Sequence, residues 1–579
     1  MNSVITPLDA LLESYDVVVA GSGASGLVAA VTAADAGLSV LVAEKAAQLG
    51  GTTAAGGGVM WAPNNHLARA AGFPDSHSDA VAYLAAAAGH VLTTQEIDWY
   101  VATAPRAVEY LTTNTRVSMT PIARPDYHME WAGATAGGRG LDNDAFDPAD
   151  YPGMAEVIRP SSYFPLLTMT ERDELNGRAA DPVLLARRAA AGVRTMGGAL
   201  VGRLLASALD RGVHVAVELP VQDLEPLGGL PGDGWNVTFA AGGDRKAVAA
   251  TAVVLASGGF EWNPRLRKAF LPFPVVPIGA PSNEGDGLEL GLKAGASVAD
   301  MTAVWGVPVI STPAHRYDGV QSGRMANVEM TLPGSITVNA AGKRFVNESL
   351  NYHDAARLFA SIDPHTRGQQ NNPAWLVFDS TYMSKYPVAG SAPGTPAEWM
   401  AVADSLQELA RKIGVDPAGL EQTLARFNAD SSAGMDTEFH RGSTPQDRFL
   451  GDAGVTPNPC LAPLATGPFY AVPVSAGVLG TSGGLATDFN GRVLDRHHQP
   501  IPRLYAAGNV SAGVFRNNYP GGGATLGSAI TRAFAVGEHL AATLAGQGSA
   551  GRDARPSGHR NRRRSDSRRP AAWGRSHVQ

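Results

Sequence analysis

A glycine-rich turn between two apolar stretches near the start of the 579-residue chain constrains the fold more than any other feature. Residues 15–44 read YDVVVAGSGASGLVAAVTAADAGLSVLVAE, so the apolar run 17–20 leads into Gly21, Gly23 and Gly26 with the spacing G-x-G-x-x-G. An alanine-rich helical pattern and a second apolar run follow. This order predicts a strand, a tight turn, a helix and a parallel strand, which together open a Rossmann-like sheet.

Each residue type in this turn has a physical reason to be present in a dinucleotide site. Gly21 permits the tight turn, Gly23 leaves room for a pyrophosphate, and Gly26 lets the helix pack closely on the strand. The helix N-terminus then offers free N–H groups to phosphate. Glu44 closes the second apolar run, near the position at which an acid binds ribose hydroxyls. This unit by itself leaves NAD, NADP and FAD open.

The composition suits a reducing compartment and excludes several classes of site. The single cysteine, Cys460, rules out an intrachain disulfide and a cysteine-rich zinc or iron–sulfur site, and His497-His498 lack partners at ligand spacing, so no metal is expected. Neither a signal peptide nor an apolar run long enough for a membrane span is evident. We expect a cytoplasmic protein without a transmembrane segment, while peripheral contact with a membrane stays open.

The C-terminal residues 546–579 differ from the rest of the chain. From Arg552 onward they hold nine arginines against Asp553 and Asp566. Such a tail is expected to be disordered. It could be an arm for nucleic acid or an acidic membrane surface, but a nonessential extension is the favoured interpretation, and no nucleic acid is expected as a partner.

A second glycine-rich stretch, residues 49–61, comes shortly after Glu44 and reads LGGTTAAGGGVMW. Five glycines and two threonines make a poor helix interior, so we expect irregular backbone lying against a ligand, with the Thr52 and Thr53 hydroxyls available. A flexible hairpin is the alternative.

Later segments repeat the pattern of the first turn, in which glycines lie next to a predicted strand or helix. A predicted strand at 247–255 ends in the glycines of 256–260, Gly285-Asp286-Gly287 opens a helix, and a last strand at 504–507 runs into a glycine turn and a helix from about Leu526. Helices are also predicted at 79–113, 194–210, 397–413 and 416–429. Residues 303–477 are rich in Pro, Asn and Tyr, and we expect them to form a catalytic domain inserted between two parts of the nucleotide-binding domain, 1–302 and 478–545.

These motifs, in this order, resemble the fumarate reductase/succinate dehydrogenase flavoprotein superfamily over residues 14–543. The resemblance implies an α/β fold, a Rossmann-like FAD-binding domain with an inserted α+β catalytic domain. Members with covalent flavin carry a histidine in the glycine loop, and residues 45–63 contain none, so noncovalent FAD is expected. The residues implied in FAD binding are Gly21, Ser22, Gly23, Ala24, Ser25, Gly26, Glu44, Lys45, Gly51, Thr52, Thr53, Gly57, Gly58, Val221, Ser257, Gly258, Asp286, Gly508, Asn509, Ala524 and Leu526.

Three stretches resemble the 3-ketosteroid Δ1-dehydrogenases within that superfamily. Asp126-Tyr127 precedes a G-G-R-G loop, the run GKRFVNES at 342–349 leads into Tyr352, and residues 519–525, YPGGGAT, are similar to that family's Y-A-G-P-G-A-T. Dicarboxylate reductases carry an arginine in this late glycine stretch. Here tyrosine and glycine occupy it, and Arg516 nearby keeps a dicarboxylate substrate as the weaker alternative.

The resemblance implies a division of labour among four residues. The Tyr519 hydroxyl and the Gly523 N–H would stabilise the ketone oxygen as it gains enolate charge. Tyr352 would take the α-proton, with Tyr127 as helper, and its pKa, near 10 in a free tyrosine, would have to be lowered by neighbours. The β-hydrogen would leave as hydride to the flavin. For each tyrosine alone, a packed aromatic with a satisfied hydroxyl is the alternative.

The predicted function is therefore FAD-dependent dehydrogenation of a 3-ketosteroid, with a double bond introduced between C1 and C2 of the A-ring. The expected partners are a steroid or other apolar ketone and an electron acceptor such as a quinone. The alternatives are Δ4-dehydrogenation, a fumarate-reductase-like flavoprotein acting on another enone or acid, and a nonenzymatic flavin-binding redox partner.

Overall fold

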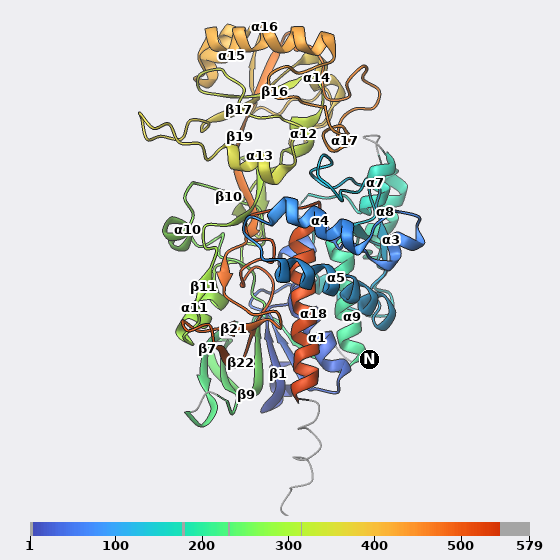
Figure 1. Ribbon diagram of the computed structural model, residues 1–579, viewed down its shortest axis with the longest axis vertical. Helices are drawn as coiled ribbons and strands as arrows, with labels where there is room; N and C mark the ends of the chain where they lie inside the picture. The colour runs from blue at the N-terminus through green and yellow to red at the C-terminus, as the bar shows by residue number, and fades with distance from the viewer. Residues whose placement is uncertain (1–3, 162, 176–179, 230–231, 314, 545–579) are drawn as a thin grey trace, which may run out of the picture.

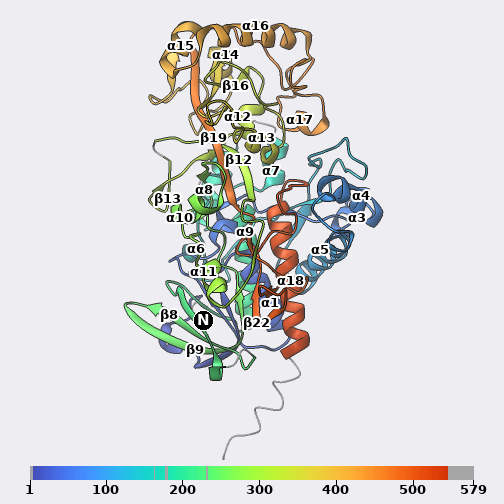
Figure 2. The same cartoon turned by 60° about the vertical axis from the view of Figure 1, so that its left-hand side comes forward.

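Two sheets, one near each end of an elongated molecule, organise the chain (Figures 1 and 2). The computed structural model describes residues 4–544 except 162, 176–179, 230–231 and 314. The arginine-rich tail predicted at 546–579 lies outside the described residues. The first sheet, which contains the strand before the glycine turn, lies at the bottom of the view in Figure 1, and the second sheet lies at the top.

The first sheet has a parallel core in the order β22-β9-β1-β2-β6. β21 is antiparallel at the edge beside β22, and the β7–β8 hairpin pairs antiparallel with the first half of β9. Because the core strands are parallel, their carboxyl ends meet at one edge, where ligands bind in sheets of this kind. The strands are β1 (Ser14–Ala20), β2 (Val40–Ala43), β6 (His214–Ala216), β7 (Val221–Pro226), β8 (Trp235–Ala241), β9 (Asp244–Leu255), β21 (Arg492–Leu494) and β22 (Pro500–Ala506).

Both faces of this sheet are buried, which explains the continuous apolar run at 17–20. Val17 and Val19 pack into the core under the helices α1 (Ala24–Asp35), α5 (Thr94–Asn114), α9 (Met196–Asp210) and α18 (Ala524–Leu544). Val18 packs into the core on the opposite face. Successive side chains of a strand point to opposite faces, so a strand covered on both sides needs apolar residues at every position. α1 and α18 stand side by side in Figure 1.

The second sheet is mainly antiparallel, in the order β15-β12-β19-β17-β16, and β10 and β18 also pair with β19. The long strand β19 runs from the top of the molecule toward its middle (Figure 1). α15 and α16 cover the outer end of the sheet, and α13 packs on β12. The elements are β10 (Val276–Pro277), β12 (Val304–Ile310), β15 (Arg324–Met325), β16 (Ser335–Asn339), β17 (Ala374–Asp379), β18 (Ala401–Ala403), β19 (Phe469–Thr481), α13 (Tyr352–Leu358), α15 (Leu406–Ile413) and α16 (Pro417–Ala433).

The remaining elements are short and lie around these two sheets. A small sheet has the order β3-β5-β4. Its strands and the other elements are β3 (Met60–Trp61), β4 (Met119–Pro121), β5 (Gly140–Asn143), β11 (Val298–Ala299), β13 (Arg316–Tyr317), β14 (Val320–Gln321), β20 (Gly484–Leu485), α2 (Gly51–Ala55), α3 (His66–Ala70), α4 (His77–Ala88), α6 (Met154–Val157), α7 (Met169–Leu175), α8 (Pro182–Ala190), α10 (Pro264–Phe270), α11 (Asp286–Lys293), α12 (Asn327–Thr331), α14 (Ser380–Lys385) and α17 (Pro445–Phe449).

The predicted α/β class with a parallel Rossmann-like core is confirmed, and two local predictions are wrong. The stretch 51–55, expected to be irregular, forms the single-turn helix α2, because its glycines stand at its boundaries: Gly50 opens it with φ +102° and Gly56 ends it. Residues 397–405 are not helical and include β18, so that helix begins only at Leu406. The domain boundaries stay a prediction. In the part of the chain that the structure describes, no helix is long and apolar enough to cross a membrane.

Candidate active site

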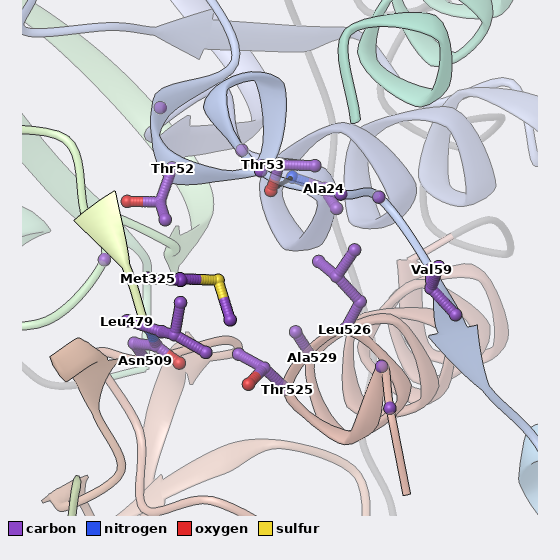
Figure 3. Close-up of a pocket in the computed structure, with 18 of the residues that line it drawn as sticks. Ala24, Thr52, Thr53, Val59, Met325, Leu479, Asn509, Thr525, Leu526 and Ala529 are labelled. Carbon is purple, nitrogen blue, oxygen red and sulfur yellow. Dashed lines mark hydrogen bonds between the residues drawn. The ribbon is translucent and has the colours of Figure 1, made fainter. Parts of the chain in front are cut away.

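A cavity of about 530 Å³ begins where the parallel strands end and extends toward the second sheet. In Figure 3, Thr52 and Thr53 of α2 face Leu526 and Ala529 of α18 across it, and Met325 projects between them. Of the predicted FAD-binding residues, all except Gly26 and Ala524 line this cavity. Those two are buried beneath its wall.

The first glycine turn fits a pyrophosphate. A Cβ on Gly21, whose φ is +111°, would lie 2.4 Å from the Ala256 carbonyl oxygen, and one on Gly26 would lie 2.0 Å from the Gly21 oxygen. Both positions therefore require glycine for close packing of strand and helix. A Cβ on Gly23 would instead meet only the Thr53 hydroxyl, at 3.7 Å, and would occupy cavity space. The N-cap residue Gly23 has no side chain, and of the first N–H groups of α1 that of Ala24 donates to the Thr53 hydroxyl at 3.1 Å, so the others stay available to phosphate.

The residues around Glu44 hold the turn in shape. The Ser22 hydroxyl and N–H donate to Glu44 Oε2 at 2.6 and 3.0 Å, and the Ala46 N–H donates to Oε1 at 2.9 Å. Glu44 still lines the cavity, and a carboxylate has further acceptor positions for ribose hydroxyls. Lys45 lines the cavity too, but its Nζ is paired with Asp286 at 3.0 Å. Burial disfavours the Lys45 charge, yet this pair and Glu284 outweigh it and raise the pKa.

Three tyrosines from distant parts of the sequence meet in the wall of the cavity. The Tyr352 hydroxyl, at the start of α13, donates to the Tyr519 hydroxyl at 3.0 Å. The Tyr127 ring lies 5.4 Å from that of Tyr352 and 5.7 Å from that of Tyr519. The Gly523 backbone lies near the Tyr519 hydroxyl. Hydrogen bonding to this backbone acts to lower the pKa of Tyr519, against the larger effect of burial. All four predicted catalytic residues thus line one region of the cavity.

The pKa values of the tyrosines contradict one expectation. Burial raises the pKa of Tyr352 well above 10, and the neighbouring Tyr127 and Tyr519 raise it further. Burial raises the pKa of Tyr127 and Tyr519 as well. The expectation that neighbouring protein groups lower the pKa of Tyr352 is therefore wrong, because these neighbours are themselves hydroxyls in a buried site.

Loop 121–140 is pinned in place by a buried ion pair. Arg139 binds Asp75 at 2.6 Å and Asp126 at 2.7 Å, and all three side chains are about 2% exposed. Asp126 also accepts a hydrogen bond from the Trp61 indole at 2.9 Å. The next residue, Tyr127, donates its backbone N–H to the Pro520 carbonyl. This sequence of contacts fixes Tyr127 against the segment that carries Tyr519.

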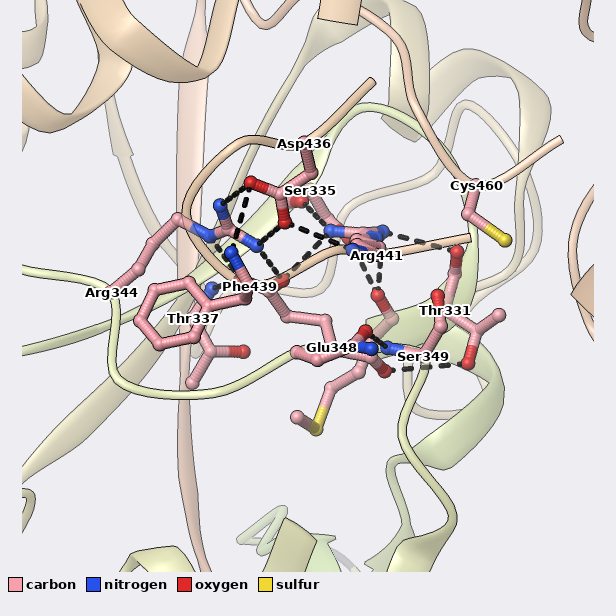
Figure 4. Close-up of polar contacts among 12 residues, drawn as sticks. Thr331, Ser335, Thr337, Arg344, Glu348, Ser349, Asp436, Phe439, Arg441 and Cys460 are labelled. Atoms are coloured by element: carbon pink, nitrogen blue, oxygen red, sulfur yellow. Dashed lines mark hydrogen bonds and ion pairs between the residues drawn. The ribbon is translucent and has the colours of Figure 1, made fainter. Parts of the chain in front are cut away.

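A second buried network holds the segment before Tyr352 (Figure 4). Arg344 binds Glu348 at 2.6 Å and Asp436 at 2.9 Å, and Arg441 approaches Glu348 at 3.3 Å, all with nearly complete burial. Arg344 lowers the pKa of Asp436 to about 2 against the effect of burial. The run at 342–349 therefore has a structural role, which is to anchor the chain that leads into α13.

The structure also shows cavity residues that the sequence did not indicate. Three arginines, Arg124, Arg172 and Arg324, line the end of the cavity that contains Tyr163 and Phe164. By contrast Arg516, which kept a dicarboxylate substrate open, is not among the lining residues and is paired with Glu96 and Asp300, each at 2.7 Å. Proximity in sequence to the late glycine stretch did not place Arg516 in the site.

Comparison with known proteins agrees with this geometry. A family model described as "FAD binding domain" matches residues 16–526. The 4-oxocyclohexanecarboxylate 2-dehydrogenase of Sinomonas cyclohexanicum is 40% identical, covering 92% of this chain and 94% of its own. The 3-oxosteroid 1-dehydrogenase of Mycolicibacterium smegmatis is 35% identical, covering 92% and 98%.

A solved structure matches most of the length of this chain. The 3-ketosteroid Δ1-dehydrogenase of Sterolibacterium denitrificans, in complex with 1,4-androstadiene-3,17-dione, has a TM-score of 0.85 and 34% identity, and the match covers 92% of this chain and all of that one. Together with the glycine turn that fits a pyrophosphate, these matches establish FAD as the cofactor. The chain belongs to the FAD-binding domain family and is an FAD-dependent oxidoreductase.

Proposed function

We propose that the enzyme introduces a carbon–carbon double bond next to the ketone of a six-membered ring. The observation that carries this proposal is the meeting of Tyr127, Tyr352 and Tyr519 beside Gly523 in the wall of the cavity. It is a site with hydroxyl groups and a backbone N–H, as a neutral carbonyl requires. Bound FAD supplies the hydride acceptor.

The Tyr519 hydroxyl and the Gly523 N–H are proposed to bind the ketone oxygen. Gly523 has φ +101°, and a Cβ there would lie 2.6 Å from the Val59 carbonyl oxygen, so the residue must be glycine to hold this backbone. Tyr519 also contacts Thr525, whose hydroxyl is 3.1 Å away. Two donors that converge on one oxygen stabilise the charge that it gains as the α-proton leaves, and one such donor contributes roughly 3–4 kcal/mol.

Tyr352 is proposed to take the α-proton as its phenolate. The C–H bond at the α-carbon then breaks, its electron pair forms the new double bond, and the β-hydrogen leaves with the other electron pair as hydride. Since burial keeps the Tyr352 pKa high, only a small fraction of the enzyme holds the phenolate at neutral pH. The rate should therefore depend on pH.

The names of the relatives fit this chemistry in two substrate classes. A 3-oxosteroid dehydrogenated at position 1 and a 4-oxocyclohexanecarboxylate dehydrogenated at position 2 both lose hydrogen at the carbon β to the ketone. C1–C2 dehydrogenation of a 3-ketosteroid, as predicted from the sequence, is one form of the proposal. Dehydrogenation of a smaller ring ketone is the other.

Anaerobic titration of the FAD-loaded enzyme with 4-androstene-3,17-dione and with 4-oxocyclohexanecarboxylate tests the proposal. Bleaching of the oxidised flavin, with a product that has lost two hydrogens at the α and β carbons, is the expected result. A flavin that stays oxidised with every ring ketone would refute it.

A further inference from the structure

We propose that Arg172 and Arg324 bind a carboxylate of the substrate, so that the enzyme acts on an oxo acid in preference to a neutral ketone. This inference rests on the proposed function and adds the substrate class. It begins from the three arginines at the end of the cavity around Tyr163 and Phe164, a concentration of positive charge that dehydrogenation of a neutral ketone does not need.

One of the three, Arg124, is already neutralised. Its Nε and Nη2 donate to the two oxygens of Asp173 at 2.8 and 2.6 Å, and the guanidinium lies over the Phe449 ring. Its charge also acts on Tyr127 beside it. Arg124 thus lies between the tyrosines and the other two arginines, with its own counter-ion.

Arg172 and Arg324 have no such counter-ion among the residues that the structure describes. The Arg172 side chain makes one polar contact with the described residues, to the Met169 sulfur at 3.9 Å, and its guanidinium lies 5.2 Å from the centre of the Phe164 ring. The Arg324 guanidinium lies 4.8 Å from the centre of the neighbouring Tyr163 ring. Because these two rings are 4.5 Å apart, both cations belong to one end of the cavity.

The acids near this end form no ion pair with these two arginines in the described ranges, although the charge of Glu329 acts on both at longer range. Glu329 accepts a hydrogen bond from the Ala389 N–H, and burial raises its pKa. Asp447 accepts from the Asn347 amide and the Gly442 N–H, and burial raises its pKa too. Within the described ranges neither acid is in an ion pair with Arg172 or Arg324. Burial, together with the charge of Arg124, lowers the pKa of Arg172 more than Asp173 and Glu329 raise it, so this guanidinium would gain from a further anionic partner.

A carboxylate suits this arrangement better than another polar group. Guanidinium groups bind carboxylates through paired hydrogen bonds of fixed geometry. Both guanidinium groups lie over aromatic rings and line the cavity, within reach of a ligand there. A ketone at Tyr519 and a carboxylate at the arginines would orient the ring between them. The acid could be borne on a small ring or on the side chain of a steroid.

Steady-state kinetics with matched substrates tests this. 4-Oxocyclohexanecarboxylate is compared with its methyl ester, and 4-androstene-3,17-dione with a 3-oxosteroid whose side chain ends in a carboxylate. For at least one of the two ring systems, we expect the acid to have a higher kcat/KM than its neutral counterpart. The acid with the higher kcat/KM then shows whether the carboxylate of the substrate is borne on a small ring or on a steroid. Equal or better use of both neutral ketones would overturn it.

The variants Arg172→Gln and Arg324→Gln identify the residues. Removing one charged hydrogen-bonding partner should reduce kcat/KM for the preferred acid by roughly 10- to 100-fold, mainly through KM, and reduce the ester's value far less. Arg265→Gln is the matched control, because Arg265 is 72% exposed and does not line the cavity. An equal loss for acid and ester would overturn the assignment, and retained FAD absorbance would show that the variants fold.

Equilibrium binding separates this inference from the proposed function. Cyclohexanecarboxylate lacks the ketone and cannot be dehydrogenated by this route, so calorimetry with the FAD-loaded enzyme reports the carboxylate site alone. Binding that is lost in Arg172→Gln supports the site even if no ketone bleaches the flavin. Binding that both variants retain unchanged overturns it even if dehydrogenation is observed.

Discussion

The Tyr352→Phe substitution separates catalysis from stability more cleanly than any other change in the site. It removes one hydroxyl, whose hydrogen bond to Tyr519 is 3.0 Å long, and leaves the ring, which lies 5.4 Å from the rings of both Tyr127 and Tyr519. Tyr519 keeps its contact with Thr525. The free energy of unfolding should therefore fall by only about 1 kcal/mol.

Catalysis should suffer much more than stability. A positioned base contributes typically 10²- to 10⁴-fold, equivalent to about 3–5 kcal/mol of barrier. We expect flavin reduction by a saturating ring ketone, followed by absorbance after anaerobic rapid mixing, to slow by this factor while FAD stays bound. Exchange of the α-hydrogens with D₂O should slow in parallel, because it reports proton removal alone.

Tyr470→Phe is the matched control. Tyr470 is a buried tyrosine that stacks on Phe378 in the second sheet and does not line the cavity, so this variant should reduce FAD at the wild-type rate. If Tyr352→Phe reduced FAD within tenfold of the wild-type rate, or exchanged α-hydrogens unimpaired, Tyr352 would not be the base.

Three further predictions follow from the geometry. Because burial raises the pKa of Tyr352, the phenolate fraction grows about tenfold per pH unit below that pKa, so kcat/KM should rise from pH 7 toward pH 10; a plateau below pH 9 would contradict this. Gly23→Val should abolish FAD binding in equilibrium titration, since its side chain would enter the cavity beside the N-terminus of α1; unchanged affinity would disprove the pyrophosphate assignment. Glu348→Gln should lower the unfolding free energy by roughly 3–5 kcal/mol in urea titration, because Arg344 then keeps only Asp436 and Arg441 has no ion-pair partner among the described residues, and a loss below 1 kcal/mol would show that the network is not stabilising.

Noncovalent attachment of FAD is a separate prediction from the sequence. The glycine loop that follows Glu44 contains no histidine, and acid precipitation should therefore release the flavin into the supernatant. Flavin fluorescence that stayed with the precipitated protein would contradict it.

The parts of the fold that could be predicted are those with a local physical cause. Residues 15–44 predict a strand, a turn and a helix. A strand that is buried on both faces requires continuous apolar residues, and close packing of strand and helix requires glycine at Gly21 and Gly26. The helix α2 could not be predicted in this way. Its five residues are held by glycines at its boundaries and by the burial of Ala54 and Ala55, which is a tertiary effect.

The same distinction between local and tertiary causes applies to the residues of the site. Tyr352 and Tyr519 could be predicted because each lies in a recognisable sequence motif, and the residues of these motifs hold the two tyrosines in place. Arg172 and Arg324 stand in no such run, and only the packing of α7 and β15 around Tyr163 and Phe164 brings them to one cavity. Arg516 shows the converse, since it lies near a motif in sequence but is fully engaged with Glu96 and Asp300.

This division bears on how relatives with one reaction can have different substrates. The glycine turns fit the cofactor through backbone geometry, and the proposed oxygen site depends on Gly523, whose conformation tolerates no other residue. Arg172 and Arg324, by contrast, line the cavity with long side chains that belong to neither network of buried ion pairs. A change there alters the charge offered to the far end of a substrate without moving a glycine turn or a tyrosine. If Arg172 and Arg324 bind the substrate carboxylate as proposed, replacing them would change the substrate class while proton and hydride removal stay the same.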